Sequence, residues 1–305
     1  MASVPGTLAA PARRRPRLAT VLRRSWPAYV LLAPFLVHFF LIVAYPFLYS
    51  IYLSFFQAGL SNQVIFVGLA NYAHLLTDTT FHDALRNTLI YTVIVVAAEV
   101  VLPLLLALVL NERLWGRTLM RTAIFLPVVT SWVVVSLIWQ IMFGAQGLAN
   151  DVLAAVHLPQ QPFFADGRQA MAVVIAVTVW KDLGYYMVIY LAALQGVSRE
   201  LVEAASIDGA SRPRVAWHVT LPSLRPVLYF VASIATINAM QVFTQPYLMT
   251  NGGPLNATIS VVQLLYREAF VQLQFGYGSA IGTVLLVMLI VLSLCNNKIN
   301  DWLSR

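Results

Sequence analysis

The chain has 305 residues, of which 60% are hydrophobic and only 10% are Asp, Glu, Lys or Arg. A soluble domain carries about 25% charged residues, so these few charges cannot cover a water-facing surface, and we expect the natural solvent to be partly lipid. The net charge of +7 does not indicate a nucleic-acid partner, because most basic residues gather in short segments beside apolar runs. Cys295 is the one cysteine, which excludes an intrachain disulfide.

Six apolar stretches are long enough to cross a hydrocarbon core of about 30 Å, which takes about 20 helical residues. They run over residues 28–54, 86–110, 122–143, 170–194, 226–249 and 278–296. The first is too long for the apolar part of a cleaved signal peptide, so we interpret it as a retained span. Prolines inside the spans, such as Pro127 and Pro246, indicate either ordinary packing irregularity or a bend that shapes a cavity.

Basic and non-basic connections alternate along the chain. The segment 1–27, the connections 111–121 and 195–225, and the tail 297–305 hold 15 of the 19 Lys and Arg residues. With six spans these parts share one side, which the positive-inside rule assigns to the cytoplasm. We therefore expect an all-α polytopic membrane protein with both termini cytoplasmic, in which a basic N-terminal segment and a short tail flank a six-span transmembrane domain over 28–296.

The connection 198–226 has a pattern that suits a rigid projection. Small alanines let a partner surface come close, and glycine adopts positive φ without steric cost. The pattern predicts a helix over 199–207 capped by Ser198, a turn at Asp208-Gly209, and a second helix capped by Ser211 that runs through Trp217. Such a knob fits a groove on another protein, and a plain surface loop with a helix in it is the alternative.

This connection also resembles the EAA loop of ABC importer permeases. The matching residues are Glu203, Ala204, Ala205, Asp208, Gly209 and Ala210, followed by Leu221-Pro222 and Pro226. The rest of the chain, from about residue 28, is similar to the sugar-type branch, carbohydrate uptake transporter family 1, which includes the maltose and glycerol-3-phosphate permeases. The supporting segments are Leu32-Ala33-Pro34, Gly68-Leu69-Ala70-Asn71-Tyr72, Leu126-Pro127, Val179-Trp180-Lys181 and Thr250-Asn251-Gly252-Gly253-Pro254.

The resemblance implies a type I ABC importer permease. Its Glu203 helix would be the coupling helix that docks into a cytoplasmic ATPase subunit, and Gly209 would permit the sharp turn. The chain would assemble with a second homologous permease and two ATPase subunits, and an extracellular binding protein would deliver the solute. ATP and Mg²⁺ would be bound by the ATPase partners, because this chain has no Gly-x-x-x-x-Gly-Lys-Ser/Thr loop to hold phosphate.

Polar residues inside the spans are candidates for the substrate path, because such residues are costly in lipid. Asn238, Gln241 and Gln245 have the spacing of one helical face. The other candidates are Thr244, Tyr247, Trp180 and Tyr185. Amides and hydroxyls beside aromatic rings suit a sugar or polyol, and hydrogen bonding between packed spans is the alternative.

Charged residues inside the spans leave a second function open. Lys181 and Asp182 are adjacent and point about 100° apart on a helix, so either an ion pair with another span or contact with the solute would account for them. A secondary transporter would need membrane carboxylates, and only Glu99 and Asp182 qualify. The sequence leaves the solute open among a disaccharide, an oligosaccharide and a glycerol-phosphate compound, with Arg267 as one indication of an anion.

Overall fold

The computed structural model describes residues 29–60, 63–112 and 114–303. The basic segment predicted over residues 1–27 lies outside the described residues. The chain divides into two compact units, residues 1–52 and 53–305, and each is considered by itself.

The described part of the first unit belongs to one helix of 25 residues, Tyr29–Leu53. A π-helical stretch, η1 (Phe39–Ala44), is followed by α2 (Tyr45–Leu53). The rings of Tyr45 and Tyr49 stack on α2 with centroids 5.8 Å apart, as side chains four residues apart do on a helix. The first predicted span is therefore helical over the expected length.

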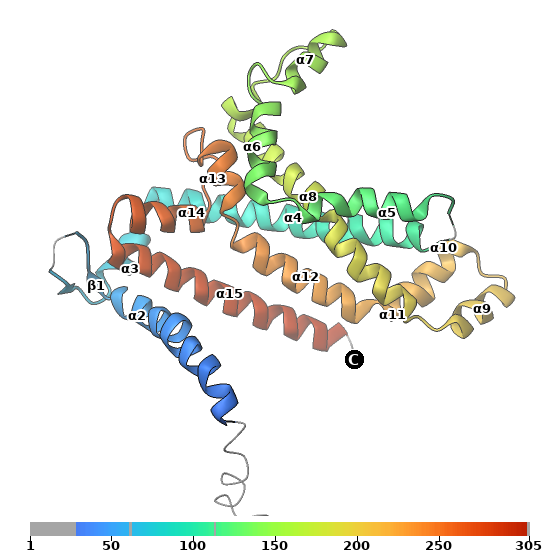
Figure 1. The fold of residues 1–305 in the computed structure, drawn as a ribbon, viewed down its shortest axis with the longest axis horizontal. Helices are drawn as coiled ribbons and strands as arrows, with labels where there is room; N and C mark the ends of the chain where they lie inside the picture. Colours follow the sequence, from blue (N-terminus) through green and yellow to red (C-terminus); the bar gives the residue numbers. More distant parts are fainter. Residues whose placement is uncertain (1–28, 61–62, 113, 304–305) are drawn as a thin grey trace, which may run out of the picture. The chain divides into compact units, whose positions relative to one another are not determined.

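The second unit begins with a small hairpin and is otherwise helical (Figure 1). Its first half contains β1 (Phe56–Gln57), antiparallel to β2 (Ile65–Phe66), then α3 (Ala70–Leu75), α4 (Thr79–Asn111), α5 (Arg117–Phe125), η2 (Leu126–Val129), α6 (Trp132–Met142), α7 (Leu148–Ala155), η3 (Phe163–Ala165) and α8 (Gly167–Gln195). Its second half contains α9 (Arg199–Ile207), α10 (Arg212–Val215), η4 (Ala216–Thr220), α11 (Leu221–Ser223), α12 (Arg225–Met240), α13 (Thr244–Thr250), α14 (Val261–Tyr266), η5 (Arg267–Val271) and α15 (Phe275–Leu303).

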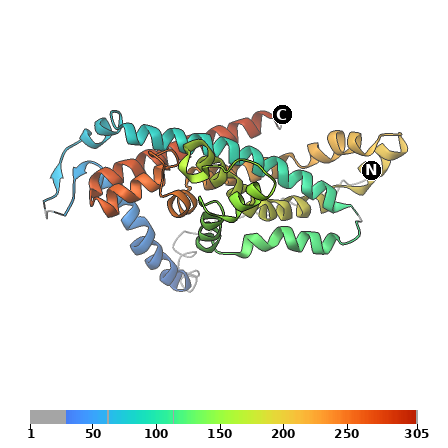
Figure 2. The same ribbon diagram turned by 90° about the horizontal axis from the view of Figure 1, so that it is seen from above.

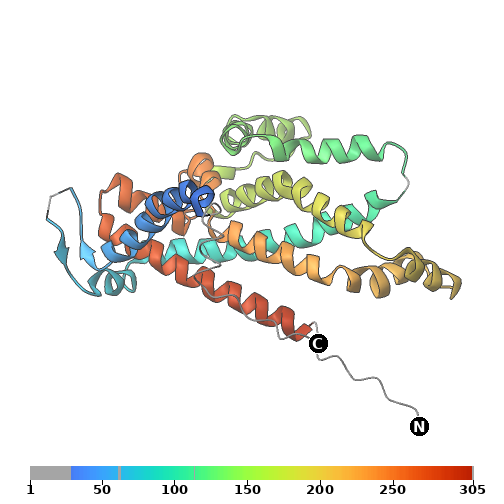
Figure 3. The ribbon, with the colours of Figure 1, turned by 60° about the horizontal axis from the view of Figure 1, so that its bottom comes forward.

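Helix α4 is the centre of the second unit and packs against α8, α12 and α14. Ala107, Tyr190 and Val231 are fully buried where α4, α8 and α12 meet. Figure 3 shows α12 running alongside α4, and α15 running alongside α12. The apolar side chains of these helices form the core that holds the long helices together.

The two basic connections lie at one end of this bundle. The connection between α4 and α5 and the helices α9 and α10 are at the same end, whereas β1 and α3 are at the other (Figures 1 and 2). The alternation predicts this placement of the two basic connections and of β1 and α3, whereas α7, in the non-basic connection 144–169, lies at the side of the bundle (Figure 1).

The number of spans depends on two bent helix pairs. Among the described residues, four helices are long and apolar enough to cross a membrane, and the number rises to six if each bent pair is one span. The pairs are Arg117–Val129 with Trp132–Met142, bent by 97°, and Pro213–Ser223 with Arg225–Met240, bent by 68°. The predicted third span is therefore broken, and the fifth is sharply bent from the helix before it.

The structure agrees with the predicted ends of one span and moves an end of two others. The fourth, expected over 170–194, agrees closely with α8. The second was expected from residue 86 but begins at Thr79, because Asp78 caps α4 and extends it into a polar region. The sixth was expected to end at residue 296, but α15 continues through Leu303 without a break into the predicted tail.

The third predicted span breaks next to Pro127. This proline lies in the 3-10 turn η2, and Thr130 and Ser131 are extended, with ψ of 140° and 136°. The carbonyl of Val128 therefore has no amide of a continuing helix to bind. It accepts a hydrogen bond from the Lys181 Nζ on α8, at 3.3 Å, so a side chain from a neighbouring helix satisfies the freed backbone group.

The fifth predicted span, 226–249, is interrupted at residues 241–243. Pro246 has no N–H, so it cannot donate to the carbonyl four residues earlier, that of Val242. The buried Ser260 hydroxyl donates to this carbonyl instead, at 2.6 Å. The expectation of one continuous helix that carries Asn238 and Gln245 on the same face is therefore wrong.

We predict that Ser260→Ala destabilises the protein by about 1–3 kcal/mol, because a buried carbonyl loses its donor. The Ser260 oxygen also accepts from the Gln263 amide at 3.1 Å, so the start of α14 loses its cap as well. Thermal unfolding in detergent measures the effect. Ser223→Ala is the control, because it removes an equivalent bond to the Val219 carbonyl, of 2.7 Å, at an exposed site. Equal losses of stability in both variants would contradict the prediction.

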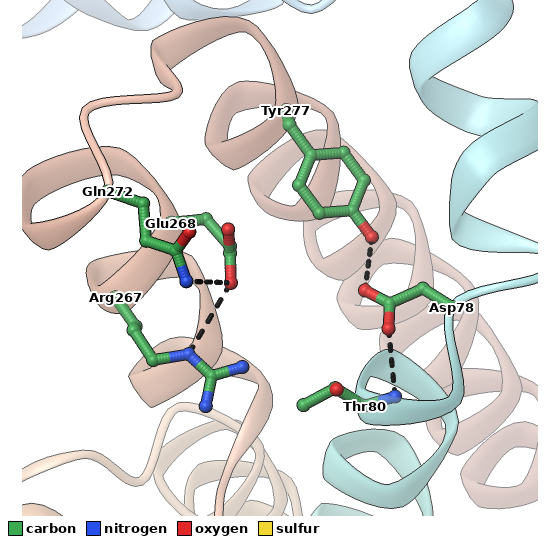
Figure 4. Close-up of polar contacts among 6 residues, drawn as sticks. All are labelled: Asp78, Thr80, Arg267, Glu268, Gln272 and Tyr277. Carbon is green, nitrogen blue, oxygen red and sulfur yellow. Dashed lines mark hydrogen bonds and ion pairs between the residues drawn. The ribbon is translucent and has the colours of Figure 1, made fainter.

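Asp78 ties the start of α4 to α15. Its carboxylate accepts from the Thr80 amide at 2.8 Å and from the Tyr277 hydroxyl at 2.6 Å (Figure 4). Burial by itself raises the pKa of Asp78, but the hydrogen bonds from Tyr277 and from the amides of Thr80 and Phe81 outweigh this, and the pKa lies below its usual range. The charged form of Asp78 is therefore favoured by folding.

We predict that Asp78→Asn lowers the melting temperature most at neutral pH. A carboxyl whose pKa is lower in the folded state adds stability above its unfolded pKa, near 3.8, and loses it as pH falls through the folded value. The difference from wild type should therefore shrink in acid. Asp83→Asn, which changes an exposed carboxylate on the same helix, is the control, and a difference for Asp78→Asn that does not depend on pH would contradict the assignment.

Candidate functional site

A cavity of about 420 Å³ lies among α4, α6, α8 and the interruption between α12 and α13. The residues that line it come from all four of these parts. They are Tyr91, Val95, Glu99, Trp132, Thr178, Asp182, Tyr186, Asn238, Ala239, Gln241, Val242, Phe243, Thr244 and Gln245. A volume of this order accommodates a small organic solute.

The two broken spans produce this cavity. Trp132, the first residue of α6, follows the break in the third predicted span and faces the cavity. Residues 241–245 follow the end of α12 and line it from another side. The prolines of these spans therefore lie beside bends that shape a cavity, which was one of the two readings of the sequence.

Hydroxyl and amide groups form a linked polar surface in the cavity. The Asn238 amide donates to the Tyr186 hydroxyl at 3.5 Å, and the Glu99 carboxyl is a hydrogen-bond partner of the same hydroxyl. The Tyr91 hydroxyl donates to the Thr178 Oγ1 at 2.9 Å. The surface therefore offers both donors and acceptors to a polyhydroxylated solute.

Aromatic rings complete the lining. Trp132 and Phe243 face the cavity. The Phe243 ring stacks on Tyr247 with centroids 5.0 Å apart and packs against Tyr266 at 5.3 Å. Tyr247 and Tyr266 support Phe243, so its position is fixed by packing.

The structure brings together four of the seven residues that we expected along the path: Asn238, Gln241, Thr244 and Gln245. Tyr247 does not line the cavity but supports Phe243. Trp180 and Tyr185 are each 42% exposed and do not line it. On α8 the cavity instead faces Thr178, Asp182 and Tyr186, which lie on the side of this helix opposite to Trp180.

Sequence reasoning missed several lining residues. Tyr91 and Thr178 look like ordinary packing residues in apolar helices, and Trp132 could be placed only once the bend before it was known. Glu99 carried a signal, because a carboxyl deep in a span is costly. It is only 2% exposed.

Lys181 does not form the interior ion pair that we considered. Among the described residues its partners are the Val128 carbonyl and the ring of Trp132, whose centroid lies 4.5 Å from Nζ. A cation above an aromatic face is stabilised by the ring quadrupole. Lys181 therefore holds the bend in the third predicted span and is not one of the cavity-lining residues.

The segment around Glu203 forms a projecting helix and turn. Helix α9 follows Ser198, as predicted, although the structure shows no hydrogen bond from the Ser198 side chain to cap it. At its end the Ala210 amide donates to the Ala205 carbonyl at 3.0 Å and the Gly209 amide donates to the Ser206 carbonyl at 3.1 Å. These two bonds are a Schellman motif.

The turn depends on Gly209, whose φ is +77°. Of the residues predicted to couple to an ATPase, Glu203, Ala204, Asp208 and Gly209 are exposed, and Ala205 and Ala210 are half-buried. Among the described residues, helix α9 packs mainly on the α10–η4 segment that follows it. The helix that follows continues through η4 and α11 to Ser223, so it ends later than Trp217, where the sequence pattern predicted its end.

Arg267 is paired with its neighbour. Its Nε lies 3.4 Å from the Glu268 Oε1, which also accepts from the Gln272 amide at 3.5 Å (Figure 4). Since the charge of Arg267 already has a partner, it gives little support to an anionic solute.

Similarity to known proteins identifies the family. Residues 99–305 match the family described as "Binding-protein-dependent transport system inner membrane component". The chain is 36% identical over 276 residues to the arabinooligosaccharides transport system permease protein AraP of Bacillus subtilis (strain 168), which covers 89% of this chain and 88% of that protein. It is 35% identical over 289 residues to the lactose transport system permease protein LacF of Rhizobium radiobacter, which covers 90% and 96%.

The fold is also similar to a solved structure of a bacterial alginate ABC transporter in complex with an alginate pentasaccharide-bound periplasmic protein. The TM-score is 0.85 at 22% identity, over 95% of this chain and 99% of the matched chain. The chain therefore belongs to the inner membrane component family of binding-protein-dependent transport systems, and it is an integral membrane permease of the ABC importer type.

Proposed function

We propose that this chain forms half of the path by which an ATP-driven importer moves a saccharide-type solute across the membrane. The cavity lined by Asn238, Gln241, Thr244 and Gln245 is the observation that carries the proposal. It combines amides and hydroxyls with the rings of Trp132 and Phe243, and a sugar offers hydroxyls on its rim and an apolar ring face to such a lining.

A second homologous permease forms the other half of the path in this proposal. Two ATPase subunits bind ATP and Mg²⁺, and an extracellular binding protein delivers the solute. The relatives named above are permeases of sugar transport systems, which favours these partners over the ion-gradient-driven alternative.

The coupling segment docks into one ATPase subunit through the exposed face of α9. Glu203 and Ala204 are exposed on it, and Ile207, which is 86% exposed, adds an apolar group that a partner would cover. The Schellman turn at Gly209 fixes the direction in which α9 projects. The end of the bundle that carries α9 is cytoplasmic in this proposal, as are both termini, the segment 1–27 and the tail 297–305.

We predict that Asn238→Ala and Gln241→Ala each lower uptake of the solute by about two- to tenfold, because a lost hydrogen bond costs about 0.5–1.5 kcal/mol. Uptake and ATPase activity are measured together on the reconstituted importer. Gln140→Ala is the control, because Gln140 is an exposed amide on α6 outside the cavity. Wild-type uptake in both cavity variants would show that these residues do not line the path.

We predict that Gly209→Val weakens association with the ATPase and reduces uptake, because a β-branched residue at positive φ costs about 1–2 kcal/mol or more. Gly209→Asn is the matched control, since asparagine tolerates the left-handed conformation and the space around Gly209 is open. Pull-down of the ATPase and transport assays measure both effects. Full transport by Gly209→Val, with normal ATPase association, would refute the coupling role.

A further inference from the structure

The cavity described above has a charge pattern that narrows the class of solute. Two carboxyl side chains, Glu99 from α4 and Asp182 from α8, line it. Among the described residues that line it there is no lysine, arginine or histidine. The remaining polar groups are amides and hydroxyls, so the ionisable side chains among these lining residues are all acids.

The nearest basic residue, Lys181, does not form an ion pair with either carboxyl. Lys181 is next to Asp182 in sequence, but its ammonium group binds the Val128 carbonyl and lies above the Trp132 ring. The ion pair that the described residues do form, between Arg267 and Glu268, involves none of the lining residues. Lys181 still acts electrostatically on Asp182, but neither Glu99 nor Asp182 forms an ion pair with a basic residue of the described part of the chain.

We expect this lining to bind saccharides of different charge with different affinity. A carboxylate or phosphate ester that enters the cavity gives up its hydration shell and meets acidic groups across a low-dielectric space, where like charges repel strongly. Sugar hydroxyls and amines instead donate hydrogen bonds to carboxyl oxygens, and bonds that involve a charged group are the stronger ones. The side-chain amides of Asn238 and Gln241 can form hydrogen bonds with acidic and with uncharged saccharides alike. The selection between these solutes therefore depends on the two carboxyls.

We propose that the cavity accepts uncharged and amine-bearing saccharides and rejects sugar acids and sugar phosphates, and that Glu99 and Asp182 impose this selection. The inference rests on the proposed function, because it assumes that the solute passes through the cavity. It names the solute class that the sequence left open and separates it from glycerol phosphates.

The test compares three β-1,4-linked disaccharides of matched shape. They are cellobiose, its analogue with a uronic acid unit, and its analogue made of two glucosamine units. Equilibrium dialysis measures their binding to the importer in lipid nanodiscs without the binding protein, so that the selectivity of that protein does not contribute. We expect the acid to bind the wild type at least about tenfold more weakly than the other two, the scale on which a built polar site rejects a mismatched group.

Glu99→Gln and Asp182→Asn, singly and together, should bring the acid to within about threefold of cellobiose, because each amide keeps the shape and removes the acidic charge. Asp151→Asn is the control, because Asp151 is an exposed carboxylate on α7 outside the cavity, and it should leave the ratio unchanged. Pull-down of the ATPase confirms that each variant is assembled.

Equal or tighter binding of the acid by the wild type would overturn the inference, as would an unchanged ratio in the assembled double variant. A failure to bind any of the three sugars would also count against it. ATP-driven uptake with the binding protein present separates the two proposals. If uptake occurs but the charge preference is absent, only this inference fails, and if no uptake occurs, the proposed function fails with it.

Discussion

A backbone carbonyl without a partner in hydrocarbon costs several kcal/mol, and this protein leaves two such groups where its helices break. Side chains that are distant in sequence donate a hydrogen bond to each of these two carbonyls. Lys181 donates to the Val128 carbonyl at the break in the third predicted span, and Ser260 donates to the Val242 carbonyl at the break in the fifth. The breaks are possible because these two side chains reach them.

The cavity follows from this constraint. An unbroken third span would not place Trp132 against α8, and an unbroken fifth span would spread residues 241–245 along one helix. Where the helices break, side chains of residues close in sequence turn toward a common space. Non-helical backbone at membrane depth is tolerated where it is buried in protein or lines a cavity, and both breaks meet this condition.

The cavity and the segment around Glu203 belong to different parts of the fold. The cavity lies in the packed interior of α4, α6 and α8, where side chains are fixed by neighbours such as the Tyr247 and Tyr266 rings behind Phe243. Helix α9 lies at the end of the bundle, and its direction depends mainly on the Schellman turn at Gly209. The two are connected by α10 to α12, a helical path that is bent by 68° between Ser223 and Arg225.

The sequence by itself determined the membrane class, the number and order of the apolar stretches, and the helix and turn around Gly209, because hydrophobic length, charge alternation and glycine chemistry are local properties. It also identified Asn238, Gln241, Thr244 and Gln245 as a polar group. Only the tertiary structure decided where the helices break and which side chains meet, since a proline permits a break but a donor from another helix must stabilise it. Tyr91, Thr178 and Trp132 became part of the cavity for this reason.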